Sequence, residues 1–106
     1  MGQYGSQLEH LLRSFPTDQV LVLQFERCVK DPATELARTY EFLGLDPTFA
    51  PGDLASPRNA ARVAKPDIDD EHRRWLVQCY EPEVARAAEL APSLDLALWA
   101  NFARLA

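Results

Sequence analysis

The chain has 106 residues and a mass of 11.9 kDa, a length that allows one domain with a modest core. Its composition, 47% hydrophobic and 25% charged, is typical of a globular protein rather than a disordered one. Sixteen acids against eleven bases give a net charge of −5, which argues against a general nucleic-acid-binding protein.

The first predicted element is an amphipathic helix that ends at Pro16. Its apolar residues recur at helical spacing and are Leu8, Leu11, Leu12 and Phe15. The next element, residues 20–25, is an apolar run that is too short for a helix and does not alternate with polar residues. Such a run is typical of a strand buried on both faces of a parallel sheet. We therefore predict one strand at residues 20–25.

A second helix is predicted to begin at Asp31 and Pro32. Asp31 is a good N-cap, and Pro32 suits the first helical position because the N–H it lacks would be unpaired there. Gly44 then stands where a helix commonly ends in a left-handed residue. Residues 46–66 have no periodicity and contain four prolines. Irregular segments of that length are usually functional or disordered.

Helical patterns resume after Asp67. The predicted buried face of this helix consists of Trp75, Leu76, Cys79 and Tyr80. We predict that Pro82 begins a separate helix and that Pro92 ends it. A last helix is predicted from the spacing of apolar residues between 98 and 105.

Five helices and one strand indicate the α/β class, with a mostly helical chain around one buried strand. A lone strand cannot satisfy its own N–H and C=O groups, so its neighbours are expected to be missing. We therefore predict that residues 1–106 are the C-terminal part of a larger α/β protein, able to self-associate through the strand edge. The alternative is that residues 20–25 form a buried extended connector in an all-helical module.

The remaining polar groups suggest no metal centre and no self-contained catalytic motif. Cys28 and Cys79 have no second thiol or histidine at metal-binding spacing, and His10 and His72 have no visible catalytic partner. We expect free, buried or semi-buried thiols in a reducing compartment, with a disulfide as the alternative. The sequence has no apolar stretch long enough for a membrane span and no leader after Met1, so we expect a soluble cytoplasmic protein.

Two places could carry function. Glu26 follows the predicted strand at the end where α/β sheets bind ligands, although it could equally cap a turn or pair with Arg27 or Lys30. Arg58, Arg62 and Lys65 lie in an eight-residue window that holds no acid. This window carries +3, so the rest of the chain carries −8. Such a loop is a candidate anion site, with the alternative that its bases pair with the acidic helix that follows.

Several segments, in this order and spacing, resemble the C-terminal half of sulfotransferases that use 3′-phosphoadenosine 5′-phosphosulfate (PAPS). The similarity is to bacterial members and to the domains that modify heparan-type sugars. The N-terminal segments are Gly2-x-Tyr4-x-x-Gln7-Leu8, Phe15-Pro16-x-x-Gln19-Val20-Leu21-Val22-Leu23-x-x-Glu26, Asp31-Pro32 and Phe42-Leu43-Gly44-Leu45. The later segments are Asn59-Ala60-Ala61-Arg62, Pro66, Leu76, Tyr80, Pro82-Glu83-Val84 and Leu94-Asp95-Leu96 running to Trp99.

This resemblance implies a three-layer α/β fold related to P-loop nucleotide kinases and transfer of a sulfuryl group from PAPS to a hydroxyl or amine. Arg62 resembles the arginine of the loop that contacts the cofactor near its 3′-phosphate, with Asn59 before it and Lys65 after it. Arg58 has no family counterpart, and its assignment rests on charge alone. The expected partners are thus the nucleotide cofactor and an unknown acceptor, with no nucleic acid and no membrane.

The family's glycine-rich 5′-phosphosulfate loop has no counterpart in this sequence. Its catalytic base and the residues that grip the 3′-phosphate are also without counterparts, so no catalytic residue is assigned. We therefore expect the chain to be inactive alone. The alternative function is a small helical protein-interaction or oligomerisation module without catalysis.

Overall fold

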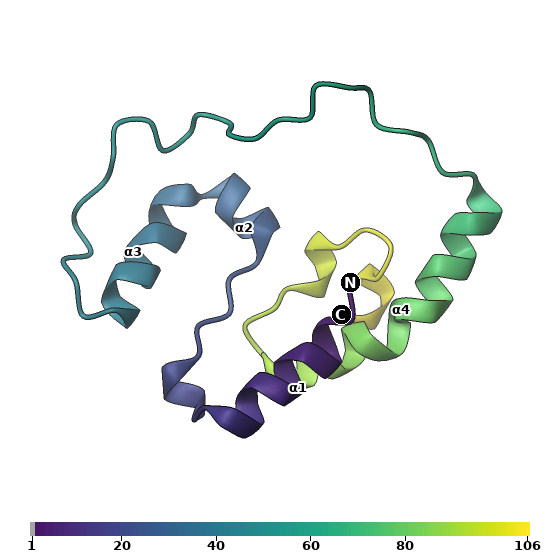
Figure 1. Ribbon diagram of the computed structural model, residues 1–106, viewed down its shortest axis with the longest axis horizontal. Coiled ribbons are helices and arrows are strands. Elements are labelled where there is room, and N and C mark those ends of the chain that lie inside the picture. The colour runs from purple at the N-terminus through teal and green to yellow at the C-terminus, as the bar shows by residue number, and fades with distance from the viewer. Residues whose placement is uncertain (1) are drawn as a thin grey trace. The chain divides into compact units, whose positions relative to one another are not determined.

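The computed structural model describes residues 2–106, which divide into two compact units. The first unit joins the chain up to Val22 with Pro66–Ala106, and the second is Leu23–Lys65. Figure 1 shows helices linked by irregular segments, the longest of which connects α3 to α4.

In the first unit, α1 (Tyr4–Ser14) packs against α4 (Asp70–Leu90). The prediction of a first helix that ends before Pro16 is confirmed, with Phe15 as its extended C-cap, but Leu11 and Phe15 of its predicted apolar face are exposed. The short 3₁₀ helix η1 (Thr17–Gln19) follows. The buried apolar residues of this unit are Val84, Ala87, Ala91 and Leu96. These are small or medium side chains, which suits a close approach of helix to helix.

The prediction that Pro82 begins a new helix is wrong, because α4 continues through it as one helix of 21 residues. The fixed φ of proline is compatible with a helix, and the cost is the hydrogen bond that its missing N–H would have donated. Asp69 caps the start of α4, where its side chain accepts a hydrogen bond of 2.9 Å from the N–H of His72. Packing against α1 stabilises the helix around and beyond Pro82.

The C-terminal segment forms two short 3₁₀ helices instead of the predicted last helix. These are η2 (Leu96–Leu98) and η3 (Ala103–Leu105). Trp99, between the two, contacts α1 instead, and its ring centroid lies 6.3 Å from that of Tyr4. A helical spacing over eight residues is too short to enforce a continuous helix against such contacts.

The second unit contains α2 (Phe25–Lys30) and α3 (Pro32–Phe42), which contact each other. The predicted cap is confirmed, because the Asp31 side chain accepts a bond of 3.2 Å from the N–H of Thr34 and Pro32 is the first residue of α3. Gly44 has the predicted left-handed conformation, with φ of 71°. The segment that follows is irregular up to Asp69, as the prolines indicated.

The α/β fold class is contradicted, because residues 2–106 contain no β-strand. Val20 and Gln24 have extended backbones, but the helix α2 already begins at Phe25. No other extended segment of the described chain pairs with this run, and an unpaired extended segment is not a strand. The sequence from 20 to 24 is therefore an extended connector between helices, as in the alternative interpretation, but Leu23 is 42% exposed rather than buried.

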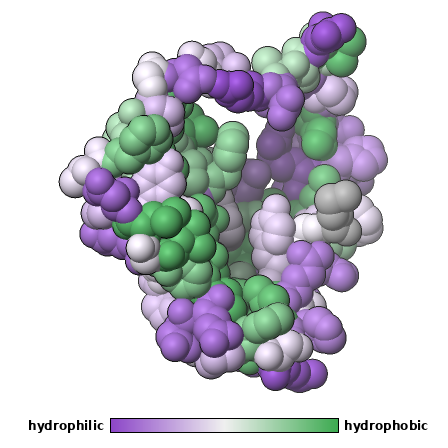
Figure 2. Space-filling view, turned by 60° about the vertical axis from the view of Figure 1, so that its left-hand side comes forward, coloured by the Kyte–Doolittle hydropathy of each residue, from purple (hydrophilic) through white to green (hydrophobic). Residues whose placement is uncertain are grey.

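Apolar side chains reach the surface in the view of Figure 2, and several expected core residues are exposed. Trp75 is 61% exposed and Cys79 is also exposed, so the predicted buried face of α4 around them is wrong. Both cysteines are free thiols and Cys28 is half-buried, but the expected burial of Cys79 is wrong. Across residues 2–106, none of the helices combines the length and apolar character of a membrane span. The cytoplasmic location stays a prediction.

Candidate anion-binding loop

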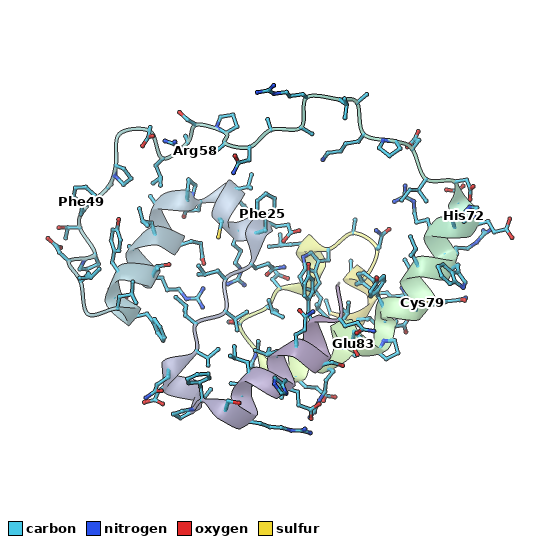
Figure 3. All side chains as sticks on the ribbon, viewed as in Figure 1. Phe25, Phe49, Arg58, His72, Cys79 and Glu83 are labelled. Atoms are coloured by element: carbon cyan, nitrogen blue, oxygen red, sulfur yellow. The ribbon has the colours of Figure 1, made fainter. Side chains whose placement is uncertain are left out.

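The four residues predicted to bind a cofactor lie on the irregular segment between α3 and α4. Arg58, Asn59, Arg62 and Lys65 are all exposed, and so is every residue from 55 to 75. Figure 3 labels Arg58 on this segment. The cluster is therefore a surface loop, available to a ligand from solvent rather than enclosed in a pocket.

The three cations of the loop are not equivalent. Arg58 forms an ion pair with the Asp53 carboxylate five residues before it. Among residues 2–106, no ion pair or hydrogen bond of the Arg62 or Lys65 side chain occurs within the usual distances. The cations available to bind an anion are thus Arg62 and Lys65.

The backbone of the loop has two fixed features. The N–H of Ser56 donates a hydrogen bond of 3.0 Å to the carbonyl of Asp53, which closes a turn just before Arg58. Asn59 has φ of 55°, a left-handed conformation that asparagine tolerates better than most residues. The chain therefore bends at Asn59, between the paired Arg58 and the unpaired Arg62.

The acidic start of α4 belongs to the first unit, where Asp69 is the N-cap of its own helix. The Asp69 carboxylate is engaged by its own helix, where its second oxygen lies 2.7 Å from His72 Nδ1. The backbone N–H and the side chain of His72 lower the pKa of Asp69 by hydrogen bonding. His72 is a surface histidine, and His10 is exposed as well.

Glu26 does not lie at the end of a strand but in the first turn of α2. Its Oε2 atom is buried and has no hydrogen-bond partner among residues 2–106. Gln24 and Glu35 are the other buried polar residues of this unit, and Glu35 pairs with Arg38 at 3.0 Å. The sequence singled out Glu26 as a candidate functional residue but placed it at the end of a strand, and it did not single out Gln24 or Glu35.

The donor chemistry of the loop fits the phosphate groups of a nucleotide cofactor. An arginine fork and a lysine ammonium, both without protein partners, can each meet phosphate oxygens, and the Asn59 amide can add a donor. No group of three or more potential metal ligands gathers in the part of the chain described.

Comparison with known proteins places these observations in a family. The model of the sulfotransferase domain matches residues 1–65, which include the whole loop from Arg58 to Lys65. The chain is 51% identical over 45 residues to the human heparan sulfate glucosamine 3-O-sulfotransferases 3B1 and 3A1. It is 47% identical over the same length to the human heparan sulfate glucosamine 3-O-sulfotransferase 6.

Each of these alignments covers 42% of this chain and between 11% and 13% of the relative. The chain therefore corresponds to a small part of those proteins. The segments after residue 65 lie outside the family match. No solved structure matches the chain.

Proposed function

Because the chain belongs to the sulfotransferase domain family, we propose that it is the C-terminal portion of an enzyme that transfers a sulfuryl group from PAPS to a hydroxyl or amine acceptor. The observation that carries this proposal is the family match over residues 1–65, which contains a loop with two unpaired cations. The relatives' names make heparan sulfate the first acceptor to test.

In this proposal Arg62 and Lys65 hold the phosphate end of the nucleotide, and Asn59 adds an amide donor. Fixed positive charge close to a multiply charged anion binds and orients it without chemical participation. PAPS supplies the activated sulfuryl group when bound. The Asp53 carboxylate offsets the charge of Arg58, so Arg58 contributes little to the loop's attraction for an anion.

We propose further that these 106 residues do not catalyse transfer alone. This proposal is supported by the exposure of every residue from 55 to 75, because a loop open to solvent does not enclose a transferring group. The test incubates the purified chain with radiolabelled PAPS and heparan sulfate, with a complete heparan sulfate 3-O-sulfotransferase as the positive control. We expect no transfer above the protein-free background. Turnover by the chain with no other protein present would contradict this.

A second candidate function, a helical interaction module without catalysis, is supported by the exposed apolar residues of α2. Phe25 is 74% exposed and Val29 is 65% exposed, and residues four apart in a helix lie on the same face. Sedimentation equilibrium of the chain across a range of concentrations separates the candidates. A defined dimer that binds no nucleotide would favour the interaction module, and a monomer that binds adenosine 3′,5′-bisphosphate would favour the enzyme portion.

A further inference from the structure

A small pocket lies at the C-terminal end of α3, inside the second unit and apart from the cationic loop. It has a volume of about 270 Å³ and is lined by Tyr40, Leu45, Asp46 and Phe49. Figure 3 labels Phe49, which lies on the irregular segment just after α3. Ligand pockets for whole small molecules are usually larger, so this volume suits a group of side-chain size.

The end of α3 gives the pocket a defined backbone. The N–H of Leu45 donates to the carbonyl of Tyr40 at 2.8 Å, and the N–H of Gly44 donates to the carbonyl of Glu41 at 3.0 Å. Together with the left-handed Gly44, these bonds form a Schellman motif, which typically brings the residue after the turn against the last helical turn. This motif holds Leu45 beside Tyr40 and places Asp46 at the edge of the pocket.

Only one oxygen of the Asp46 carboxylate at that edge accepts hydrogen bonds. Both hydrogen bonds that Thr48 donates, from its N–H at 2.9 Å and its hydroxyl at 2.7 Å, go to Asp46 Oδ1. Oδ2 accepts none within the described residues and takes part in no ion pair there. The Thr48 hydroxyl and N–H lower the pKa of Asp46, so this carboxyl is ionised at neutral pH.

The surrounding charge is also negative. The last turn of α3 contains no basic residue but does contain Glu41, and the carbonyls at a helix C-terminus carry partial negative charge. The aromatic residues Tyr40 and Phe49 also favour a cation, because the faces of their rings attract positive charge. The ring centroids are 6.3 Å apart and the ring planes are inclined at 48°, so the two rings do not stack face to face.

We propose that this pocket binds an organic cation, an alkylguanidinium or alkylammonium group, with its charge at Asp46 Oδ2 and its carbon chain against Leu45 and Phe49. The observations that converge on this ligand are an ionised carboxylate with a free oxygen, two aromatic faces and a helix C-terminus without a basic residue. Such a cation can come from a free small molecule or from an arginine or lysine side chain of another protein.

The test is a titration of the ¹⁵N-labelled chain, followed by the amide resonances of Leu45, Asp46 and Phe49. The ligands are n-butylguanidinium and n-butylurea, which match in size and shape but differ in charge. We expect saturable shifts with n-butylguanidinium and an affinity at least about fivefold weaker for the neutral urea. Equal affinities for the two compounds would overturn the proposal, since the pocket would then recognise only apolar area.

Single substitutions test which residues of the pocket bind the cation. Asp46→Asn keeps an oxygen for the Thr48 bonds but removes the charge, and it should weaken n-butylguanidinium binding about fivefold or more. Asp53→Asn removes an exposed carboxylate outside the pocket and should leave the affinity unchanged. Phe49→Ala should weaken binding of both compounds. Unchanged affinity in Asp46→Asn, in a variant whose remaining amide spectrum is native, would contradict the assignment.

Titration with N-acetyl-arginine amide distinguishes the two sources of the cation. Binding as tight as that of n-butylguanidinium supports recognition of an arginine side chain in a partner. Binding of n-butylguanidinium without binding of N-acetyl-arginine amide supports a free small cation. The pocket would then have no room for the backbone amides that an arginine residue carries.

Discussion

The Glu83 carboxylate accepts two hydrogen bonds from Ser6, one from the backbone N–H at 2.7 Å and one from the hydroxyl at 2.6 Å. A residue in the middle of α4 thus satisfies a free N–H in the first turn of α1, 77 positions away in sequence. Figure 3 labels Glu83 near the start of α1. The capping of α1 therefore comes from its partner helix rather than from its own N-cap residue, which makes no side-chain bond.

This contact predicts a specific dependence of stability on pH. The hydroxyl and then the N–H of Ser6 lower the pKa of Glu83 from its ordinary value of 4.5. A carboxyl whose pKa is lower in the folded state stabilises the fold above its unfolded pKa, and the contribution is lost as pH falls through the folded value. We expect the free energy of unfolding of wild type to drop below about pH 5 more steeply than that of Glu83→Gln.

Urea unfolding of both proteins between pH 3 and pH 7 measures this difference. Ser6→Ala, which keeps the backbone bond but loses the hydroxyl bond, should lie between them. Glu71→Gln is the matched control, because it removes an exposed carboxylate of the same helix that has no ion pair among the described residues. Parallel pH profiles for wild type and Glu83→Gln would contradict the role given to Glu83.

The close approach of α1 to α4 depends on the missing side chain of Gly5. A Cβ at this buried position would lie 2.6 Å from the Glu83 carbonyl oxygen and 2.8 Å from Arg86 Cβ. Because a backbone carbonyl in a helix cannot move aside, we expect Gly5→Ala to cost about 1–2 kcal/mol despite the better helix propensity of alanine. Gly52→Ala, where a Cβ meets nothing within 4 Å, is the control. Thermal unfolding that ranks both variants as equally stable would contradict this packing.

The end of α3 depends on glycine for a different reason. Gly44 has open space around its Cα but a φ of 71°. We therefore expect Gly44→Ala to lose about 1 kcal/mol through backbone strain alone, and Gly44→Asn to lose less. Chemical denaturation of the two variants tests the order. A stability of Gly44→Ala equal to that of wild type would mean that the turn does not need a left-handed residue.

Local capping signals were readable from the sequence. Asp31 and Pro32 begin α3 and Gly44 ends it because each residue acts on the backbone within its own turn. The cationic loop was also predicted, since prolines and the absence of periodicity exclude regular structure. These signals depend on neighbours in sequence, which are always present.

The predictions that failed depended on contacts distant in sequence. A strand at residues 20–25 requires partner strands, and none exists among residues 2–106, so the run became a connector. Proline was expected to break α4 at residue 82, but contact with α1 stabilises that helix. The pairing of Arg58 with Asp53 was also invisible, because a charge count does not reveal which cation has a partner.

The central claim is that Arg62 belongs to a nucleotide-binding loop, and calorimetric titration tests it most directly. Adenosine 3′,5′-bisphosphate is titrated into the enzyme that we propose contains this chain and into its Arg62→Ala and Arg58→Ala variants. The unpaired Arg62 should contribute a charge-assisted phosphate contact, so we expect Arg62→Ala to weaken binding by about one to two decades. Arg58→Ala should change the affinity little, because Asp53 already offsets its charge. An affinity for Arg62→Ala equal to that of the wild-type enzyme, in a variant with unchanged circular dichroism, would contradict the account.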